Sequence, residues 1–349
     1  MATVLGRCRA DDVPDLLRFL DEHWKRGHAF TRCRALLDWQ HRDAGGAAYS
    51  FVLARRESDS ELMGILGFLP TCRFDPALAA DNTLWLTTWK VREDAAEAGL
   101  GLRMLRFLTD AERHVAVGAI TVNAGTQPIY KRLGYRVGEL RHYVLPNPDV
   151  ARFELAAIDR AALPPAVDGA SNTLSAMPMD TENASEWASR LHMDGDGPSC
   201  PRKTVTYFAN RYLRHPIYRY AVHALLEGAT PLAIVATRVA AHGGRRALRI
   251  VDYAGPPDVL ARAGGAILRI VGEHDAEYAD VYNAGIDPGI FASAGFLAID
   301  PDGPTIVPDH FEPFERSNVR LWFSLKGNTA PVLFKGDADQ DRPNIVVPA

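Results

Sequence analysis

The strongest constraint on the fold is a segment that occurs twice in this 349-residue chain. The first copy is NAGTQPIYKRLGY, residues 123–135, and the second is NAGIDPGIFASAGF, residues 283–296. Both begin with Asn-Ala-Gly, carry a proline at the same distance from the asparagine and end in glycine followed by an aromatic residue. The copies lie about 160 residues apart, which is the size of an ordinary domain. Two copies at this spacing indicate tandem domains and not a solenoid.

The order of the predicted elements supports the duplication. Residues 1–150 predict a strand, a helical region, an antiparallel hairpin, a further strand, a glycine-containing loop, a helix, a strand, a short helix and a terminal hairpin over residues 135–144. Residues 176–349 repeat most of this order, with one helix expected over residues 259–274. Residues 151–175, rich in Ala, Pro and Asp, are the expected linker.

Composition excludes several classes of protein. With 47% hydrophobic and 23% charged residues and a formal charge of −4, the chain has no overall attraction for nucleic acid or an anionic membrane. Its four cysteines are too scattered for metal-ligand spacing, which indicates reduced thiols and no metal site. The sequence has no apolar signal core and no long apolar run. We therefore expect a soluble cytoplasmic protein without a membrane or nucleic-acid partner; its oligomeric state stays open.

The most informative local feature is the loop containing Gly99, Leu100 and Gly101, between the predicted strand over residues 84–91 and a helix. Glycines let backbone amides approach a phosphate, and a helix N-terminus adds partial positive charge. Because a Gly-x-Gly also fits a tight turn, the loop alone is a weak signal.

The order of these elements, with Asn123, Tyr130 and then Leu-Gly-Tyr, resembles the GCN5-related N-acetyltransferase (GNAT) superfamily. The resemblance covers most of the first half, and the second half shares its shape. It implies an α/β (α+β) fold of two tandem GNAT-like domains, each a mixed, mostly antiparallel sheet flanked by helices. It also implies transfer of an acyl group from acetyl-CoA, or another short-chain acyl-CoA, to an amine.

The resemblance assigns roles to individual residues. Tyr130 would protonate the leaving thiolate, although it also fits a core aromatic residue of a short amphipathic helix. Gly99, Leu100 and Gly101 would hold the pyrophosphate of CoA, and the pantetheine arm would be flanked by Thr88, Trp89, Lys90, Val91 and Asn123. The loop departs from the family pattern at Ala96, where Gln or Arg is usual, so the phosphate contact of that longer side chain is not expected here.

A general base is harder to identify from the sequence. His28 and Glu22 are the candidates, because they belong to the N-terminal helical region that borders the acceptor in this superfamily. A polar residue in such a region is also often a surface or capping residue.

The second copy of the repeat lacks the phosphate loop. Phe291 stands where the first copy has Tyr130, and Pro256-Pro257 replaces the Gly-x-Gly. Gly264-Gly265 lies inside the expected helix and is interpreted as a close-packing site. We therefore expect only the first domain to bind the acyl donor, and the second to shape the acceptor pocket.

The tandem arrangement and three segments narrow the resemblance to bacterial nucleotide-sugar N-acyltransferases. The segments are EHWKRGHAF (residues 22–30), LLDWQH (residues 36–41) and FKGDADQDRPN (residues 334–344). The resemblance implies a nucleotide-linked aminodeoxy sugar, for example a dTDP-amino-dideoxyhexose, as the acceptor. The candidate substrate-binding residues are Asp339, Asp341, Arg342 and Tyr253. A solvated charged tail remains the alternative for residues 334–344.

Two other functions stay open. The chain fits an acetyltransferase for another small amine, and it also fits a non-catalytic CoA-binding protein with a GNAT-like fold.

Overall fold

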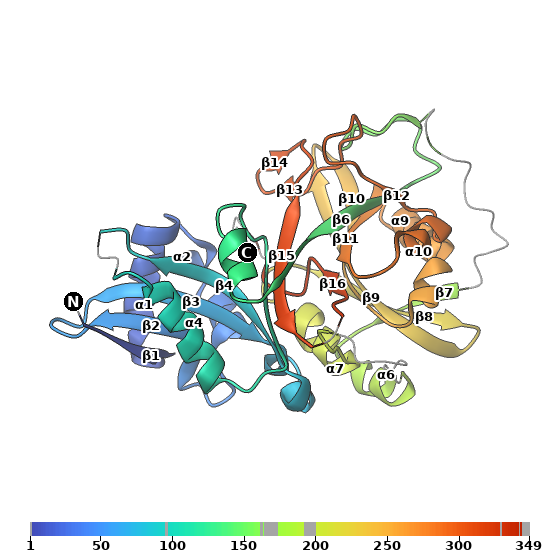
Figure 1. The fold of residues 1–349 in the computed structure, drawn as a ribbon. Coiled ribbons are helices and arrows are strands. Elements are labelled where there is room, and N and C mark those ends of the chain that lie inside the picture. Colours follow the sequence, from blue (N-terminus) through green and yellow to red (C-terminus); the bar gives the residue numbers. More distant parts are fainter. Residues whose placement is uncertain are drawn as a thin grey trace.

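Two runs of strands join edge to edge in one large sheet, with helices packed on it (Figure 1). The computed structural model describes residues 2–94, 97–160, 163, 174–191, 200–328, 330–341 and 343. Within these residues, the order of the 14-stranded sheet is β1-β2-β3-β4-β5-β15-β6-β11-β10-β9-β8-β7, with β12 on β6 and β16 on β11.

The first half contains, in chain order, β1 (Thr3–Arg9), η1 (Ala10–Asp12), α1 (Val13–Phe19), η2 (Leu20–Trp24), α2 (Ala29–Arg32), α3 (Arg34–His41), β2 (Ala48–Arg56), β3 (Leu62–Pro70), η3 (Thr71–Arg73), η4 (Pro76–Asp81), β4 (Thr83–Val91), α4 (Leu100–Ala111), β5 (Ala116–Ile120), α5 (Gln127–Arg132) and β6 (Arg136–Pro146).

The second half contains β7 (Leu174–Met179), α6 (Ala184–Arg190), α7 (Val205–Phe208), η7 (Ala209–Leu213), β8 (Tyr220–Glu227), β9 (Thr230–His242), β10 (Arg245–Ala254), α8 (Pro257–Ala261), α9 (Gly264–Glu273), β11 (Ala276–Ala284), α10 (Pro288–Ser293), β12 (Leu297–Ala298), β13 (His310–Phe311), β14 (Phe314–Glu315), β15 (Leu321–Gly327) and β16 (Leu333–Phe334).

Most neighbouring strands are antiparallel. The parallel neighbours among the described strands are β4 with β5 and β10 with β11, one pair in each half. The same arrangement therefore occurs twice, and the mixed, mostly antiparallel sheet predicted from the sequence is confirmed.

The two halves exchange strands. β15, from the second half, lies between β5 and β6 of the first half. β6 pairs with β15 over residues 136–140 and with β11 over residues 141–146 (Figure 1). The predicted hairpin over residues 135–144 is therefore wrong. This segment is one continuous strand, because partners from the second half satisfy its backbone on both sides.

Two glycines make room for β15. A Cβ atom added to Gly138 would lie 2.7 Å from a ring carbon of Phe323. At Gly118, a Cβ would lie 2.6 Å from a methyl carbon of Leu325. Both positions therefore need glycine because bulky side chains of β15 occupy the space beside them.

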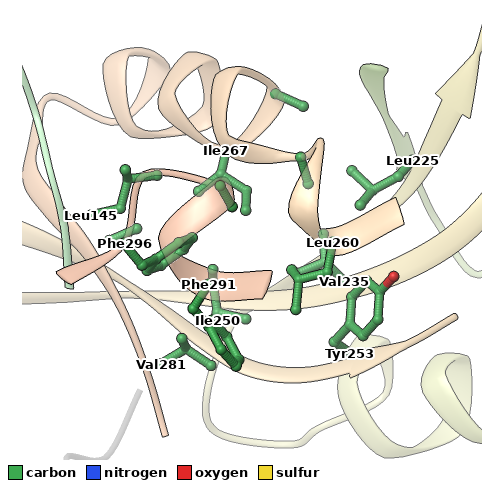
Figure 2. Close-up of a cluster of buried hydrophobic side chains, with 14 of the residues drawn as sticks. Leu145, Leu225, Val235, Ile250, Tyr253, Leu260, Ile267, Val281, Phe291 and Phe296 are labelled. Atoms are coloured by element: carbon green, nitrogen blue, oxygen red, sulfur yellow. The ribbon is translucent and has the colours of Figure 1, made fainter. Parts of the chain in front are cut away.

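The second half buries its main core between the sheet and the helices α8, α9 and α10 (Figure 2). The predicted helix over residues 259–274 is two helices, α8 and α9, which break before Gly264. A Cβ on Gly264 would lie 2.1 Å from the carbonyl oxygen of Ala294, so this site is closely packed, as predicted. Among the described helices, none combines the length and apolarity needed to cross a membrane.

Candidate active site

The repeated segment folds into the same local structure in both halves. Asn123 Oδ1 accepts a hydrogen bond from the amide of Thr126 at 3.0 Å, and Asn283 Oδ1 accepts one from the amide of Ile286 at 3.1 Å. The short helix that follows closes with a glycine at positive φ, 80° at Gly134 and 88° at Gly295. The sequence repeat is therefore a repeat of structure.

In the first half, this turn borders an open cavity. β4 and β5 pair only over Thr83–Trp85, so the later residues of β4 are not paired to β5. A cavity of about 910 Å³ is lined by the end of β4, the start of α4, the turn after β5, α5 and the C-terminal tail. Its lining residues include Trp24, Thr87, Thr88, Trp89, Val91, Gly99, Gly101, Thr121, Asn123, Tyr130, Arg132, Asp339 and Gln340. We call it the donor cavity.

The predicted phosphate loop opens onto this cavity. Gly99 precedes α4 with φ of 80°, a conformation that favours glycine, and Gly99 and Gly101 line the cavity. Leu100 is buried and its amide donates to the carbonyl of Glu97, so it does not line the cavity. The first turn of α4 thus presents a helix N-terminus to the donor cavity. Ala96 lies outside the described residues.

Threonine hydroxyls of β4 are buried at this cavity. The Oγ1 atoms of Thr87 and Thr88 have no hydrogen-bond partner among the described residues. Because buried hydroxyls are normally hydrogen-bonded, they suit a ligand that carries amide groups. Trp89 and Val91 also line the cavity. Lys90 does not, and its Nζ forms an ion pair with Oε1 of Glu93 at 2.8 Å.

Tyr130 lies on α5 with its ring against those of Trp89 and Tyr135. Burial raises the pKa of its phenol well above the ordinary value. The Ser324 hydroxyl of β15 lies near enough to offset part of this shift, although its oxygen makes no hydrogen bond of normal geometry. The phenol therefore keeps its proton over a wider pH range than an exposed tyrosine does.

The two candidate bases lie elsewhere. His28 is buried and caps α2, with Nδ1 accepting from the amide of Phe30 at 3.3 Å. Glu22 is exposed. Neither lines the donor cavity, so the role of base stays a prediction that their positions do not support.

The C-terminal tail, residues 333–341, first packs between strands of the second half and then reaches the donor cavity of the first half. β16 pairs with β11 at Asn283 and Ala284, and the amide of Gly336 donates to Val251 of β10 at 2.8 Å. β16 thus occupies the opening between β10 and β11 that corresponds to the donor cavity. Phe291, in place of the tyrosine, is fully buried in the core there (Figure 2).

The four residues predicted to bind the substrate, Asp339, Asp341, Arg342 and Tyr253, do not share one environment. Asp339 lines the donor cavity. Asp341 is buried and ion-paired with Arg238 at 2.9 Å, which lowers its pKa to about 2 although burial opposes ionisation. Tyr253 lies in the core, where its hydroxyl donates to the carbonyl of Pro256 (Figure 2). Arg342 lies outside the described residues.

A second, polar cavity of about 170 Å³ adjoins the first and shares Thr121, Asp339 and Gln340 with it. Its other lining residues are Tyr218, Arg238, Asp309, His310, Phe311, Glu312, Leu321, Lys335 and Asp341. We call it the polar cavity. Sequence reasoning missed Thr121, which adopts a φ of 65° where the two cavities meet. This conformation is strained for a β-branched residue, and such strain often occurs at functional sites.

Comparisons with known proteins bear on the fold. No protein-family model and no curated protein sequence matches the chain. A GCN5-related N-acetyltransferase from Kribbella flavida has 12% sequence identity, with 93% of this chain and 70% of that chain covered and a TM-score of 0.50. One from Anabaena variabilis has 12% identity, with 93% and 72% covered and a TM-score of 0.49. The likeness to the Kribbella structure shows that the chain has a GNAT-like fold.

Proposed function

We propose that this protein is an acyl-CoA-dependent N-acyltransferase with one donor site, in its first half. The donor cavity carries the proposal, because a helix N-terminus with glycines and a buried phenol both lie on it. The GNAT-like fold is consistent with the proposal. The sequence analysis assigned the CoA pyrophosphate to the loop at Gly99 and Gly101, and this loop lines the donor cavity.

The residues present fit the parts of the donor. Gly99 and Gly101 at the start of α4 would hold the pyrophosphate through backbone amides. Thr87 and Thr88 would hydrogen-bond the pantetheine arm, whose amides match their buried hydroxyls. The thioester supplies an activated acyl group, and Tyr130 would give its proton to the departing sulfur.

The second half would bind the acceptor. The polar cavity continues into an open groove of about 530 Å³, with which it shares Tyr218, Arg238, Phe311 and Glu312. The groove adds Arg219, which is exposed, and His274. The adjoining cavity and groove, lined by aromatic and cationic groups, support an elongated acceptor, and a nucleotide-linked aminosugar is the class we propose.

A panel of amines tests the proposal. Release of free thiol from acetyl-CoA is expected with a dTDP-linked amino-dideoxyhexose and not with a polyamine or an aminoglycoside. Release with one of the other amines instead would replace the acceptor class and keep the reaction. Absence of release with every amine, while CoA still raises the melting temperature, would favour a non-catalytic CoA-binding protein.

A further inference from the structure

The proposed reaction needs a group that removes a proton from the amine, and the donor cavity points to one. Among its described lining residues, Asp339 is the sole carboxylate, and no histidine lines it. We infer that Asp339 is the catalytic base, supplied by the C-terminal tail to the site in the first half. This inference rests on the proposed acyl transfer.

The tail is fixed immediately before Asp339. The carboxylate of Asp337 contacts Lys203 Nζ at 2.6 Å and accepts from the amide of Phe334 at 2.7 Å. Arg211 donates to the carbonyl of Ala338 at 2.8 Å. These partners are buried, so the backbone that carries Asp339 has a defined path.

The tail is fixed again immediately after Asp339. Asp341 accepts from Nε and Nη2 of Arg238 at 3.1 and 2.9 Å, and from the hydroxyl of Tyr220 at 2.6 Å. Asp339 therefore lies between two anchored residues. Asp339 is only 2% exposed although it lines two cavities, as expected of a preorganised group.

The other carboxylates of the polar cavity, Asp309, Glu312 and Asp341, do not line the donor cavity. Asp309 contacts Lys335 at 2.5 Å and Arg249 at 3.3 Å, and Asp341 is paired with Arg238. Glu312 accepts from the hydroxyl of Tyr218 at 2.6 Å and does not line the donor cavity. Asp339 is the carboxylate that lines both cavities, which is where an amine from the acceptor meets the thioester.

The step balances with the groups present. The amine nitrogen forms a bond to the thioester carbonyl carbon, and the carbon–sulfur bond breaks. One proton moves from that nitrogen to the Asp339 carboxylate, and the phenol proton of Tyr130 moves to the sulfur. Solvent then returns a proton from Asp339 to the phenolate, giving an amide and free CoA.

The test compares Asp339→Asn, Asp339→Glu and the unaltered enzyme, with acetyl-CoA and the dTDP-amino-dideoxyhexose as substrates. Asp339→Asn should lower kcat on the order of 100-fold, as expected for loss of a general base. The KM for acetyl-CoA and the melting shift caused by CoA should stay within about twofold, since no phosphate contact is removed. Asp339→Glu should recover part of the rate. Asp149→Asn, an exposed aspartate after β6, is the matched control.

A second measurement separates catalysis from folding. Hydroxylamine is a weaker base than an alkylamine and depends less on a proton acceptor, so the Asp339→Asn defect should be smaller with it as the acyl acceptor. An unchanged kcat in Asp339→Asn, or an equal defect with both nucleophiles, overturns the inference while the acyltransferase proposal stands. If the unaltered enzyme acylates no amine at all, the proposed function fails and this inference with it.

Discussion

Asn123 and Asn283 form the same turn, but only the second reaches into the tail strand. The side-chain amide of Asn283 donates to the carbonyl of Leu333 at 2.9 Å, whereas Asn123 is exposed and lines the donor cavity. One site of the duplicated fold is thus filled by the protein itself, and the other is open to a ligand.

Gly101→Arg should weaken donor binding. A Cβ at Gly101 would lie 3.2 Å from Nε1 of Trp89, so a long side chain must enter the donor cavity or displace this ring. We expect the apparent Kd of CoA, measured by calorimetry, to rise at least about tenfold, a change of about 1.4 kcal/mol. Gly272→Arg is the control, because nothing lies within 4 Å of a Cβ there. An unchanged CoA affinity in Gly101→Arg would remove this loop from the donor site.

Tyr130→Phe should lower kcat on the order of 100-fold with little change in CoA affinity, since it removes only the proton donor. In the unaltered protein, burial raises the pKa of this phenol, so it stays protonated through the pH range in which an exposed tyrosine ionises. The rate should therefore show no alkaline decline at the ordinary tyrosine pKa. Tyr135→Phe, which changes the adjacent ring, should keep the rate within about twofold. A normal kcat in Tyr130→Phe would make Tyr130 a core residue only.

Lys203→Met should destabilise the whole chain. Lys203 contacts Asp252 at 2.5 Å and Asp337 at 2.6 Å, and all three side chains are buried. Removing the cation leaves the buried carboxyl groups of Asp252 and Asp337 without their partner, and breaking a buried ion pair in this way typically costs about 3–5 kcal/mol. Urea unfolding followed by circular dichroism measures the change. A loss below about 1 kcal/mol would show that water or rearrangement relieves the two charges.

Asp337 should make stability depend on pH. Burial is the largest influence on its carboxyl and raises its pKa from 3.8 to about 7. The folded state then holds a proton that the unfolded state has released, so this group stabilises the fold below about pH 4. That contribution is lost as the pH rises to about 7. Asp337→Asn should flatten this fall in unfolding free energy, measured in urea between pH 4 and pH 8. An equal slope in both proteins would contradict the assignment.

Gly138→Val should destabilise the pairing of β15 with β6, which joins the two halves. Its Cβ would lie 2.7 Å from the Phe323 ring, so the substitution displaces β15 and should cost about 1–3 kcal/mol in unfolding free energy. Gly6→Val, on the edge strand β1 with nothing within 4 Å, is the matched control and should be close to neutral. Equal stability of the two variants would mean that β15 can shift without loss.

Structural features that depend on residues close together in the chain were predicted correctly from the sequence. The hairpin β2–β3, the entry to α4 at Gly99 and the paired turns at Asn123 and Asn283 all depend on local patterns and were confirmed. The mixed sheet followed from the order of such elements.

Long-range pairing was not predictable in the same way. The alternating side chains of β15 identify a strand but not its neighbours, and β6 looked like a hairpin because its partners lie far along the chain. For the same reason, the sequence did not reveal that the tail fills the opening between β10 and β11. His28 has the chemistry of a base, but its ring is used to cap α2.

The shared strand β6 also decides how an acceptor reaches the donor. Its backbone is bonded to β15 at one end and to β11 at the other, so swinging the halves apart would break sheet hydrogen bonds along its length. For the proposed reaction, we therefore expect substrates to enter through openings already present in the folded chain and not through a hinge. The separation of thioester and amine would then be set when the chain folds, and the two reactants would meet without a closing movement.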